Sequence, residues 1–551
     1  MLRHRSKGTL RLYAAAAGAS AVAVIVATGI GGAATPGLTP VPNAQPKSAG
    51  VSAPTAISPE LALIERARGS MKLENGTTDI PYYGYDGDGP MVPAAGDTPS
   101  ATHKVEATKT EPDKNTYLVL KSQTGADPNY DYGTHFLYQG HELGLGYITR
   151  VNLDADTAHR VTLLATKDTS GNPLPAIDGS TWDPWAKRLL FSAESGASGG
   201  VWQSTLDGKV VTLHGSLGRG GYEGLQNDSD GNLWVVEDVG GTTIPGTSAR
   251  NPNSFVYRFV PTDPTDLTHG KLEVLQVESS RTGQPIKFQA VDAAHPSGGT
   301  FTDDEKDLHT YGTTFTTKFV TIHDTAVDGT TSFDANALAK AAGGTPFKRP
   351  ENGQFQPGTS FKNFFFDETG DTNANTTAGS QFGGFGGIQK LTLDAPGSDN
   401  GTLTPYFVGD VAHTGLDNTA FWDKTHVVFV EDAGDTLHTQ RNGFDSAYLF
   451  DTTADYSNPA NVPLRFIAQG RDPSATIDSG FAGMTGFQNE GDNEITGFHV
   501  SDGDPKTNGI LGAKLPHPFK DGWRVFFTNQ HGDNITDEIV PDPSSHSDVK
   551  P

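Results

Sequence analysis

The stretch Tyr222-Glu-Gly-Leu-Gln-Asn-Asp-Ser-Asp-Gly-Asn-Leu-Trp-Val-Val-Glu-Asp238 contains two short β-rich runs separated by Asp, Asn and Gly, and it ends on two acids. Turn-forming residues between two such runs are typical of a β-hairpin. The same phrase recurs with variation at residues 178–194, 349–368, 416–432 and 494–531. A hairpin that repeats along a chain predicts a propeller, in which the first run of each phrase is an inner strand and side chains from several blades converge on one channel.

A sixth copy of the phrase is expected ahead of these five. We interpret residues 133–142 as its inner strand and residues 146–153 as the next strand, and we expect the first folded strand near residues 116–121. The stretch 262–346 is longer than a blade needs and contains a helix candidate at 334–342, so it is an insertion that could build a wall of the site. The sequence therefore predicts an all-β fold, a six-bladed β-propeller with an insertion of loops and a short helix before the fourth phrase.

The N-terminus has the features of an export signal. Basic residues, among them Arg3, Arg5 and Lys7, precede an apolar, Ala-rich run over residues 12–30, and Gly32-Ala-Ala34 offers small residues for cleavage. An uncleaved membrane anchor is the alternative, because the run is near the lower length limit for a membrane span. We expect a secreted, extracellular protein.

Composition divides the rest of the chain. Residues 35–60 are rich in Pro, Ala, Ser and Thr, which predicts a disordered spacer. The expected order is a signal peptide over 1–34, this spacer, an N-terminal extension over 61–115, a catalytic propeller over 116–540 and a disordered tail over 541–551.

Net charge and cysteine usage exclude several function classes. The 551-residue chain has a formal net charge of −25 at pH 7 and contains no Cys. The acidity argues against binding to nucleic acid and to anionic membranes. It would also repel a phosphorylated substrate unless bound cations invert the local field. The lack of Cys excludes disulfides, thiolate metal sites and a Cys nucleophile.

Four acids stand at equivalent places near the ends of the expected inner strands. They are Glu142, Glu223, Glu351 and Asp417. Hard cations such as Ca²⁺ take about six to eight oxygen ligands from carboxylates, amides and carbonyls, and Asn418 beside Asp417 adds an amide oxygen. Acids on different blades meet only if the ring closes, so the pattern predicts a cation site in the channel. The alternative is that these acids only cap turns.

The tripeptide Arg349-Pro-Glu351 heads one of the phrases. In an extended strand Arg349 and Glu351, two residues apart, would project to the same side. A carboxylate that holds a metal beside a guanidinium that forks onto an anion suits phosphate binding; a surface ion pair is the alternative. No Gly-x-Ser-x-Gly elbow, His-Glu-x-x-His helix or Walker loop is present, which fits chemistry carried out by a metal-bound oxygen.

Several short motifs occur together in one order along the chain. They are Gly140-His-Glu142, Tyr222-Glu-Gly224, Phe347-Lys-Arg-Pro-Glu351, Thr369-Gly-Asp371, Leu416-Asp-Asn418, Glu494-Ile-Thr-Gly497 and Thr528-Asn-Gln-His531. In this combination the chain resembles the PhoX-type alkaline phosphatases and their secreted relatives from about residue 116 to about residue 535. The resemblance implies a six-bladed propeller and a phosphomonoesterase with a calcium and iron cluster. It also implies that Glu223 and Glu351 bind metal, that Arg349 holds the substrate phosphate, and that Glu142 lies in the first metal-binding blade.

The chain departs from the family pattern at one position. The characterised enzymes have an iron-binding Cys just before the first-blade acid, where this sequence has Gln139-Gly-His-Glu142. Either His141 substitutes as a ligand, or the iron pair is absent or replaced. Ca²⁺ is therefore the expected cofactor, with Fe³⁺ as a second possibility.

The function expected from these observations is that of a secreted, metal-dependent phosphoric monoester hydrolase. Arg349 is the expected catalytic and substrate-binding residue, and the expected metal ligands are Glu142, Glu223, Glu351, Asp417, Asn418 and His141. Its partners would be small phosphate monoesters, with no nucleic acid and no membrane after signal cleavage, and the protein would be a monomer. A calcium-dependent lactonase or esterase, and a non-catalytic calcium-stabilised binding propeller, are the alternatives.

Overall fold

The computed structural model describes residues 36–41, 45–46, 55–85, 110–373, 379–470, 494–530 and 534–545. The expected signal peptide and His531 lie outside these residues. The described part is mostly β-structure, with four short α-helices: α1 (Asp303–Leu308), α2 (Thr325–Asp328), α3 (Ala335–Ala342) and α4 (Gly434–Arg441). No helix in the described ranges is long and apolar enough to cross a membrane.

Four of the sheets contain four or five antiparallel strands each. The first is β3 (Thr116–Val119), β4 (His135–Gly140), β5 (Ile148–Asn152) and β6 (Val161–Ala165); the second is β7 (Ser180–Asp183), β8 (Arg188–Ala193), β9 (Gly200–Ser204) and β10 (Val211–Leu213). The others are β20 (Leu416–Phe421), β21 (His426–Glu431), β22 (Ser446–Asp451), β23 (Leu464–Ala468) and β1 (Ala56–Ile57), and then β24 (Glu494–Ser501), β25 (Arg524–Gln530), β26 (Ile535–Pro541) and β2 (Leu61–Ala67).

The fifth sheet has nine strands. Their order is β11 (Tyr222–Asn227), β12 (Leu233–Glu237), β13 (Val256–Asp263), β14 (Asp266–Val277), β15 (Phe315–Asp324), β19 (Asn400–Val408), β18 (Gly387–Leu393), β17 (Asn363–Glu368) and β16 (Gly353–Phe355). The expected separate blades are not seen here, because β15 pairs with both β14 and β19 and joins them into one sheet.

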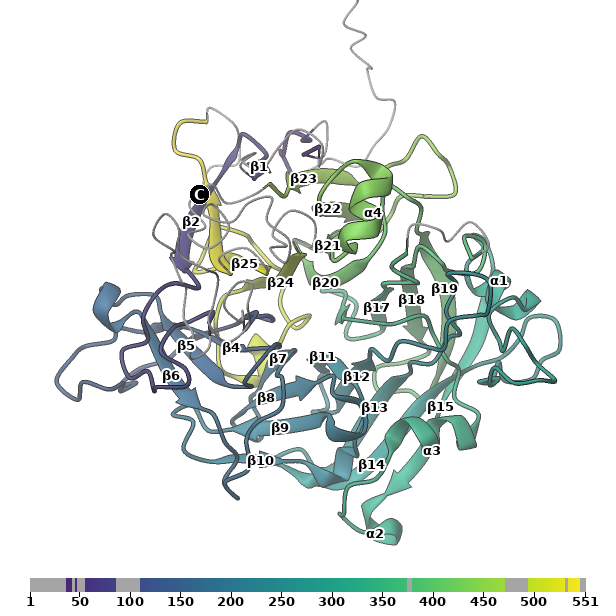
Figure 1. The fold of residues 1–551 in the computed structure, drawn as a ribbon, viewed down its shortest axis with the longest axis horizontal. Helices are drawn as coiled ribbons and strands as arrows, with labels where there is room; N and C mark the ends of the chain where they lie inside the picture. Colours follow the sequence, from purple (N-terminus) through teal and green to yellow (C-terminus); the bar gives the residue numbers. More distant parts are fainter. Residues whose placement is uncertain are drawn as a thin grey trace, which may run out of the picture.

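The sheets are arranged like the blades of a propeller. Figure 1 shows β7, β11, β20 and β24 near the middle, with β2, β6, β10, β14 and β23 towards the rim. The end strands β3, β7, β11, β16, β20 and β24 each contact the next one around the ring, and β24 contacts β3. We call these six the inner strands. The all-β, propeller-like arrangement predicted from the repeated phrase is confirmed.

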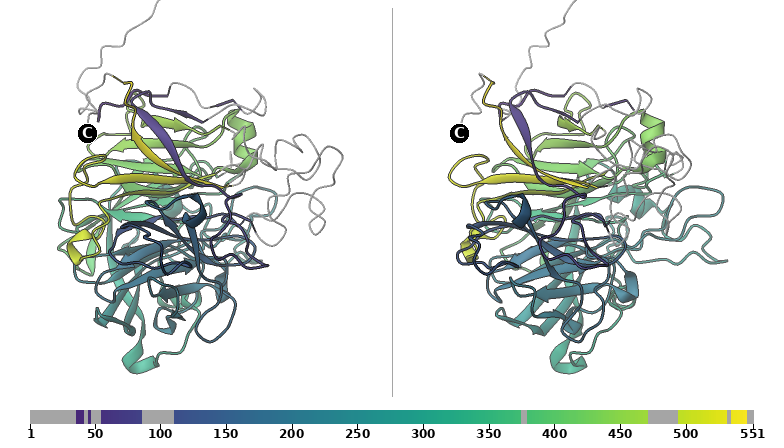
Figure 2. Two further views of the ribbon diagram at one scale, coloured as in Figure 1. Left: turned by 90° about the vertical axis from the view of Figure 1, so that its left-hand side faces the viewer. Right: turned by 60° about the vertical axis from the view of Figure 1, so that its left-hand side comes forward.

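The ring is completed by strands from the N-terminal part of the chain. β2 pairs with β26, from Leu61 opposite Pro541 onward, and β1 pairs with β23. Figure 2 shows β2 (purple) lying along the C-terminal strands (yellow). The prediction that folded strands begin near residue 116 is therefore wrong. The segments expected as a disordered spacer and as a separate extension each contribute a strand to a propeller sheet.

The five hairpins predicted from the phrase form as β7–β8, β11–β12, β16–β17, β20–β21 and β24–β25. The sixth differs from the prediction. Its inner strand is β3, and β4, predicted as the inner strand, is the second strand of that sheet. The connection from residue 120 to 134 is too long to show a hairpin signal, which is why the register of this sheet was misassigned.

Three inner strands carry a bulge near their N-terminal ends. The register shifts between Tyr222 and Leu225 in β11, between Leu416 and Thr419 in β20, and between Thr496 and His499 in β24. A bulge bends the strand and re-aims the side chains that it contains. Glu223 lies within the bulge of β11 and Asp417 within the bulge of β20. A bulge at the same place in two sheets therefore changes the direction of one acidic side chain in each.

The apolar core lies between neighbouring sheets. Phe136 of β4 belongs to one buried cluster with Phe191 of β8 and Trp202 of β9. Trp234 of β12 packs edge-on against Phe355 of β16, with ring centroids 5.0 Å apart. Burying an aromatic or aliphatic side chain of this size stabilises by about 1.5–3 kcal/mol. These contacts fix the sheets against one another and therefore fix the inner strand ends that carry the acids.

The insertion between β14 and β16 contains β15 and helices α1 to α3. The helix predicted at 334–342 is α3, with Asp334 as its N-cap accepting a hydrogen bond from the backbone of Ala337. β14 begins at Asp266 and pairs with β13, so the start of the stretch expected as an insertion is in fact part of the sheet.

Candidate metal and anion site

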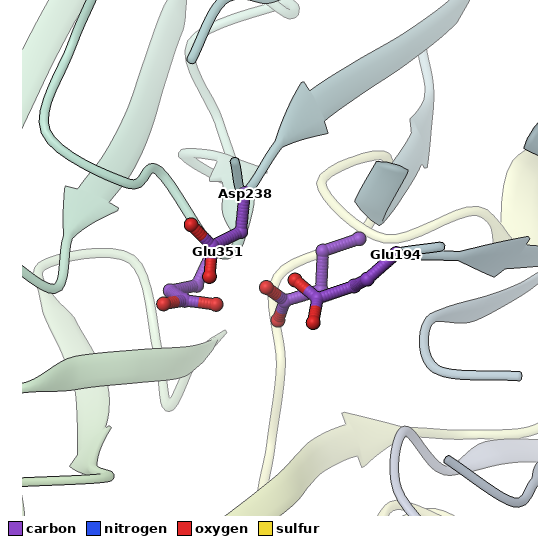
Figure 3. A group of neighbouring side chains, drawn as sticks. Glu194, Asp238 and Glu351 are labelled. Atoms are coloured by element: carbon purple, nitrogen blue, oxygen red, sulfur yellow. The ribbon is translucent and has the colours of Figure 1, made fainter. Parts of the chain in front are cut away.

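Four carboxylates from three adjoining hairpins converge at one point. We call Glu194, Glu223, Asp238 and Glu351 the first acid group; each offers an oxygen, and these oxygens lie within 4.8 Å of one another. Glu194 follows β8, Glu223 lies in β11, Asp238 follows β12 and Glu351 precedes β16. Figure 3 shows the labelled carboxylates converging from separate parts of the chain.

Hydrogen bonds hold two members of the first acid group in place. Asn352 Nδ2 donates to Glu223 Oε1 at 2.8 Å, and the Thr369 hydroxyl donates to Glu351 Oε1. The backbone of Gly224 also donates to the carbonyl of Glu351 at 2.9 Å. A Cβ at Gly224 would lie 2.8 Å from that carbonyl oxygen, so this position requires glycine for the two strands to approach.

Burial and mutual repulsion dominate the electrostatics of this group. Burial, then the charges of Glu351 and Asp178, raise the pKa of Glu223 well above its usual range. Burial, then Asp238, raise the pKa of Glu351, although Arg349 opposes the shift. Glu194 Oε1 and Glu223 Oε2 have no hydrogen-bond partner among the described residues. Carboxylates in such a setting must bind protons or a cation.

A second acid group lies on the neighbouring blades. Asp113, Glu142 and Asp178 place one oxygen each within 4.8 Å of one another. Gln530 Nε2 donates to Asp113 Oδ2 at 3.2 Å and to Glu142 Oε2 at 3.0 Å. Burial, then the charges of Asp113 and Glu142, raise the pKa of Asp178 well above its usual range. The structure thus places Glu142 beside two acids that sequence reasoning did not select.

Asp417 interacts electrostatically with members of both groups. The charge of Asp417 contributes to the raised pKa of both Glu223 and Asp178. Asn418 Nδ2 donates to Asp417 Oδ1 at 2.8 Å, and the buried Lys114 donates from Nζ to Asn418 Oδ1 at 2.9 Å. The amide oxygen expected to bind a metal therefore accepts from an ammonium group, while Asp417 Oδ2 has no hydrogen-bond partner in the described ranges.

The structure does not bring His141 to either acid group. Its ring is fully buried and stacks on Tyr147 with centroids 3.8 Å apart. Its Nδ1 lies 3.2 Å from the Thr110 hydroxyl and its Nε2 lies 2.9 Å from the Thr149 hydroxyl. Burial lowers the pKa of His141 well below its usual range. Because both ring nitrogens have hydroxyl partners, the expectation that His141 substitutes for the missing Cys is not met.

The side chain of Arg349 lies against the first acid group. Its backbone conformation differs from the extended strand that the sequence predicts. Its φ of 58° is left-handed, so the expected extended strand begins only later, at β16. The guanidinium pairs with Asp238, at 2.6 Å from Nη2 to Oδ2, and lies 3.3 Å from Glu351 Oε1. Nη1 donates to the Thr372 hydroxyl at 3.3 Å.

A cleft of about 500 Å³ opens beside the first acid group. Its lining residues are Glu194, Asp238, Gly240, Arg250, Arg349, Thr372, Asp432, Gly434 and Thr436. The cleft gives a small molecule access to Arg349 and to two of the four acids, and its volume is in the range of small-molecule sites, about 300–1,000 Å³.

Four acids of the two groups were missed by sequence reasoning: Asp113, Asp178, Glu194 and Asp238. A signal for the last two was present, because four of the five phrases, those ending at residues 194, 238, 368 and 432, end on an acid. These two acids follow the second strand of a hairpin, whereas the predicted ligands lie near the inner strands.

The comparisons with known proteins bear on the fold. No protein-family model matches the chain, and no curated protein matches it in sequence. A solved structure of Pseudomonas fluorescens PhoX in complex with vanadate, a transition state analogue, is similar to it, with a TM-score of 0.51 and 11% identity over 92% of this chain and 98% of that chain. The likeness is one of fold. A putative 6-phosphogluconolactonase from Bacteroides uniformis matches with a TM-score of 0.30 and 12% identity over 88% of this chain and 97% of that chain.

Proposed function

We propose that this protein is a secreted, metal-dependent hydrolase of phosphoric monoesters. One observation carries the proposal: Arg349 and two members of the first acid group, Glu194 and Asp238, line the same cleft, in a chain whose fold is similar to that of PhoX. Clustered carboxylates suit cations, and a guanidinium suits a phosphoryl group. Arg349 Nη2 lies 3.3 Å from Glu351 Oε1. A cation bound by the carboxylates and an anion bound by the guanidinium would therefore lie side by side.

The residues present fit a hard cation such as Ca²⁺. Every member of both acid groups offers carboxylate oxygen, the ligand type that Ca²⁺ prefers, and two oxygens of the first group lack a hydrogen-bond partner in the described structure. Glu194, Glu223, Asp238 and Glu351 would hold one cation, and Asp113, Glu142 and Asp178 would hold another. Neither group contains His, so nothing in the donor set favours Fe³⁺ over Ca²⁺, and we propose Ca²⁺ alone.

The proposed reaction is attack of water on phosphorus with loss of the alcohol. A bound cation would supply compensation for the negative charge and a water of lowered pKa. Arg349 would bind the phosphoryl oxygens through Nη1, whose partner in the protein is the Thr372 hydroxyl. Asp238 fixes the guanidinium from the opposite side through Nε and Nη2, so the group is already oriented before an anion arrives.

We also propose that the nine-stranded sheet is two blades fused at their outer edges. Strands β11 to β14 and strands β16 to β19 each repeat the four-strand order of the other sheets, and β15 bridges β14 and β19. Counted in this way, the six inner strands belong to six blades. The fusion would explain why the long insertion sits at this point in the chain.

A pair of generic substrates tests the function. Hydrolysis of 4-nitrophenyl phosphate and 4-nitrophenyl acetate is measured on the full chain after chelation, with and without added Ca²⁺. We expect phosphate ester hydrolysis that requires Ca²⁺. Hydrolysis of the acetate alone would instead support the lactonase or esterase alternative. Binding of Ca²⁺ without hydrolysis of either substrate would support the non-catalytic alternative.

A further inference from the structure

Two guanidinium groups line the cleft, and they differ in their partners. Arg349 is paired with Asp238 and contacts Glu351. Arg250 lines the same cleft, but its guanidinium makes no hydrogen bond or ion pair within the part of the chain that the structure describes. Burial raises the pKa of Asp371, and the charges of Lys348 and Arg250 oppose that shift. Asp371 is, however, already bound by Lys348 Nζ at 2.8 Å. The charge of Arg250 is therefore available to a ligand.

The backbone of Arg250 is held firmly although its side chain is not. Its N–H donates to Asp371 Oδ1 at 3.0 Å, and it forms an antiparallel bridge with Thr243. Because Lys348 also binds Asp371 Oδ1 and directly precedes Arg349, one buried carboxylate ties the chain at Arg250 to the chain at Arg349. The two arginines therefore have a fixed spacing at their backbones, as two contacts to one ligand require.

Gly240 provides the space in which the Arg250 guanidinium lies. A Cβ at position 240 would be 2.7 Å from Arg250 Nη1, which is closer than real Cβ contacts occur. Gly240 has no left-handed φ, so its backbone does not itself require glycine. The steric reason for glycine here is the guanidinium, and a methyl group would displace it.

We propose that Arg250 forms a second anion subsite, which favours phosphomonoesters whose alcohol part carries a further anionic group, either a carboxylate or a second phosphate. This proposal rests on the proposed function. Guanidinium groups bind both anions through paired N–H donors. In a cleft that also carries Glu194, Asp238 and Asp432, an anionic substrate needs a positive charge beyond the one that Asp238 already balances at Arg349.

Kinetics on matched substrates test the subsite. With Ca²⁺ present, kcat and KM are measured for phenyl phosphate, 4-carboxyphenyl phosphate and a 1,4-phenylene bisphosphate. Arg250→Ala should raise KM at least tenfold for the two anionic esters, about 1.4 kcal/mol of binding free energy, and should change KM for phenyl phosphate less than twofold. Arg250→Lys should restore only part of the loss. Gly240→Ala should reproduce the Arg250→Ala effect, because it displaces the guanidinium.

Arg188→Ala is the matched control. Arg188 is a half-buried arginine without an acid partner in the described structure, and it lines a separate cleft of about 430 Å³. The Arg188→Ala substitution should leave the KM values for all three substrates unchanged. Thermal melting and Ca²⁺ binding of each variant establish that the fold and the cation site are intact.

Equilibrium binding separates failure of the subsite from failure of the proposed function. Calorimetry compares phenylphosphonate with 4-carboxyphenylphosphonate, which cannot be hydrolysed. If no phosphate ester is turned over, but the carboxylated probe binds more tightly and Arg250→Ala abolishes the difference, the subsite stands and the hydrolase proposal is wrong. If wild type hydrolyses phenyl phosphate but neither KM nor probe binding responds to Arg250→Ala, the subsite is overturned and the hydrolase proposal is unaffected.

Discussion

Arg349 Nε lies 2.9 Å from both carboxylate oxygens of Asp238, and Arg349 Nη2 lies 2.6 Å from Oδ2. Asp238 is also a member of the first acid group, so one carboxylate belongs to the proposed cation site and also holds a guanidinium. This shared residue couples the two halves of the proposed site. Replacing Asp238 would affect both, whereas replacing Arg349 or Glu351 should separate them.

Arg349→Ala should reduce kcat/KM on a phosphate ester by about 100-fold or more, which is about 2.7 kcal/mol of lost transition-state stabilisation. Arg349→Lys should recover activity only in part, because an ammonium lacks the two-pronged geometry. Ca²⁺ binding, measured by calorimetry, should be retained in both variants, since the guanidinium is not a ligand. Near-full activity of Arg349→Ala would refute the phosphate-binding role.

Glu351→Gln should lose cation and activity together. The amide keeps the shape of the side chain but removes one of four charges that converge within 4.8 Å. Elemental analysis after equilibration with Ca²⁺ should show a lower metal content than wild type. Glu65→Gln is the control, because Glu65 is exposed and its ion-pair partner among the described residues is Arg68, away from both acid groups. An unchanged metal content in Glu351→Gln would remove Glu351 from the proposed ligands.

Chelation should lower the melting temperature of the wild-type protein. The acid groups repel each other when no cation is bound, and a ligand that binds only the native state stabilises it by about 2.7 kcal/mol at a concentration 100 times its Kd. The measurement is a thermal melt in chelator, followed by a melt with excess Ca²⁺ restored. Equal melting temperatures, once metal loss has been verified, would argue against a cation in the channel.

His141→Phe should destabilise the protein without changing its metal content. The phenyl ring can keep the stacking on Tyr147, but the buried hydroxyls of Thr110 and Thr149 lose a partner, at a cost of about 1–3 kcal/mol. Thr149→Val removes one of the same hydrogen bonds and should act in the same direction. Loss of bound metal in His141→Phe at an unchanged melting temperature would mean that His141 is a ligand after all.

His309 should make stability depend on pH in the alkaline range. Burial disfavours its charged form, but the charge of Glu368, 3.1 Å away, and that of Glu305 raise its pKa from 6.5 to about 9. A raised folded-state pKa contributes stability that is complete below pH 6.5 and is lost as the pH rises through about 9. Burial also raises the pKa of the facing Glu305 to about 8, which acts in the same direction.

Unfolding in denaturant at pH 7, 8, 9 and 10 checks this expectation. The wild-type free energy of unfolding should fall over this range by up to about 3 kcal/mol on account of His309. His309→Gln should be less stable at pH 7, and the difference between the two proteins should shrink as the pH rises. A difference that stays constant from pH 7 to 10 would show that His309 is uncharged in the native state.

The parts of the fold that were predictable are those with a short-range signal. The β11–β12 hairpin is one example. Asp228 Oδ1 accepts hydrogen bonds from the backbone of Asp230 and Asn232, which stabilises the turn that the Asp, Asn and Gly residues predict. Strand β2 is the opposite case. Its sequence, Leu-Ala-Leu-Ile-Glu-Arg-Ala, is rich in helix formers, and it is a strand because β26 pairs with it from the far end of the chain.

The site was predictable to a similar degree. Glu223, Glu351 and Arg349 were selected from their place in the phrase, and the structure brings them together. Glu194 and Asp238 also end phrases, but their convergence depends on how neighbouring sheets pack, which the local pattern does not contain. His141 was predicted as a ligand because it stands beside the position of the family's missing Cys, and its actual surroundings depend on Thr110, 31 residues earlier in the chain.

Pairing of Leu61 with Pro541 has a kinetic consequence. Closing the ring brings together residues from nearly opposite ends of the sequence. The chain therefore loses the entropy of closing a long loop before the contacts of the last sheet stabilise it. Strand β2 cannot gain its partner β26 until the C-terminal part of the chain is present. Asp113 receives hydrogen bonds from Thr496 and Gln530 on β24 and β25. The second acid group would therefore be completed late in folding, and cation uptake there would report the final step of assembly.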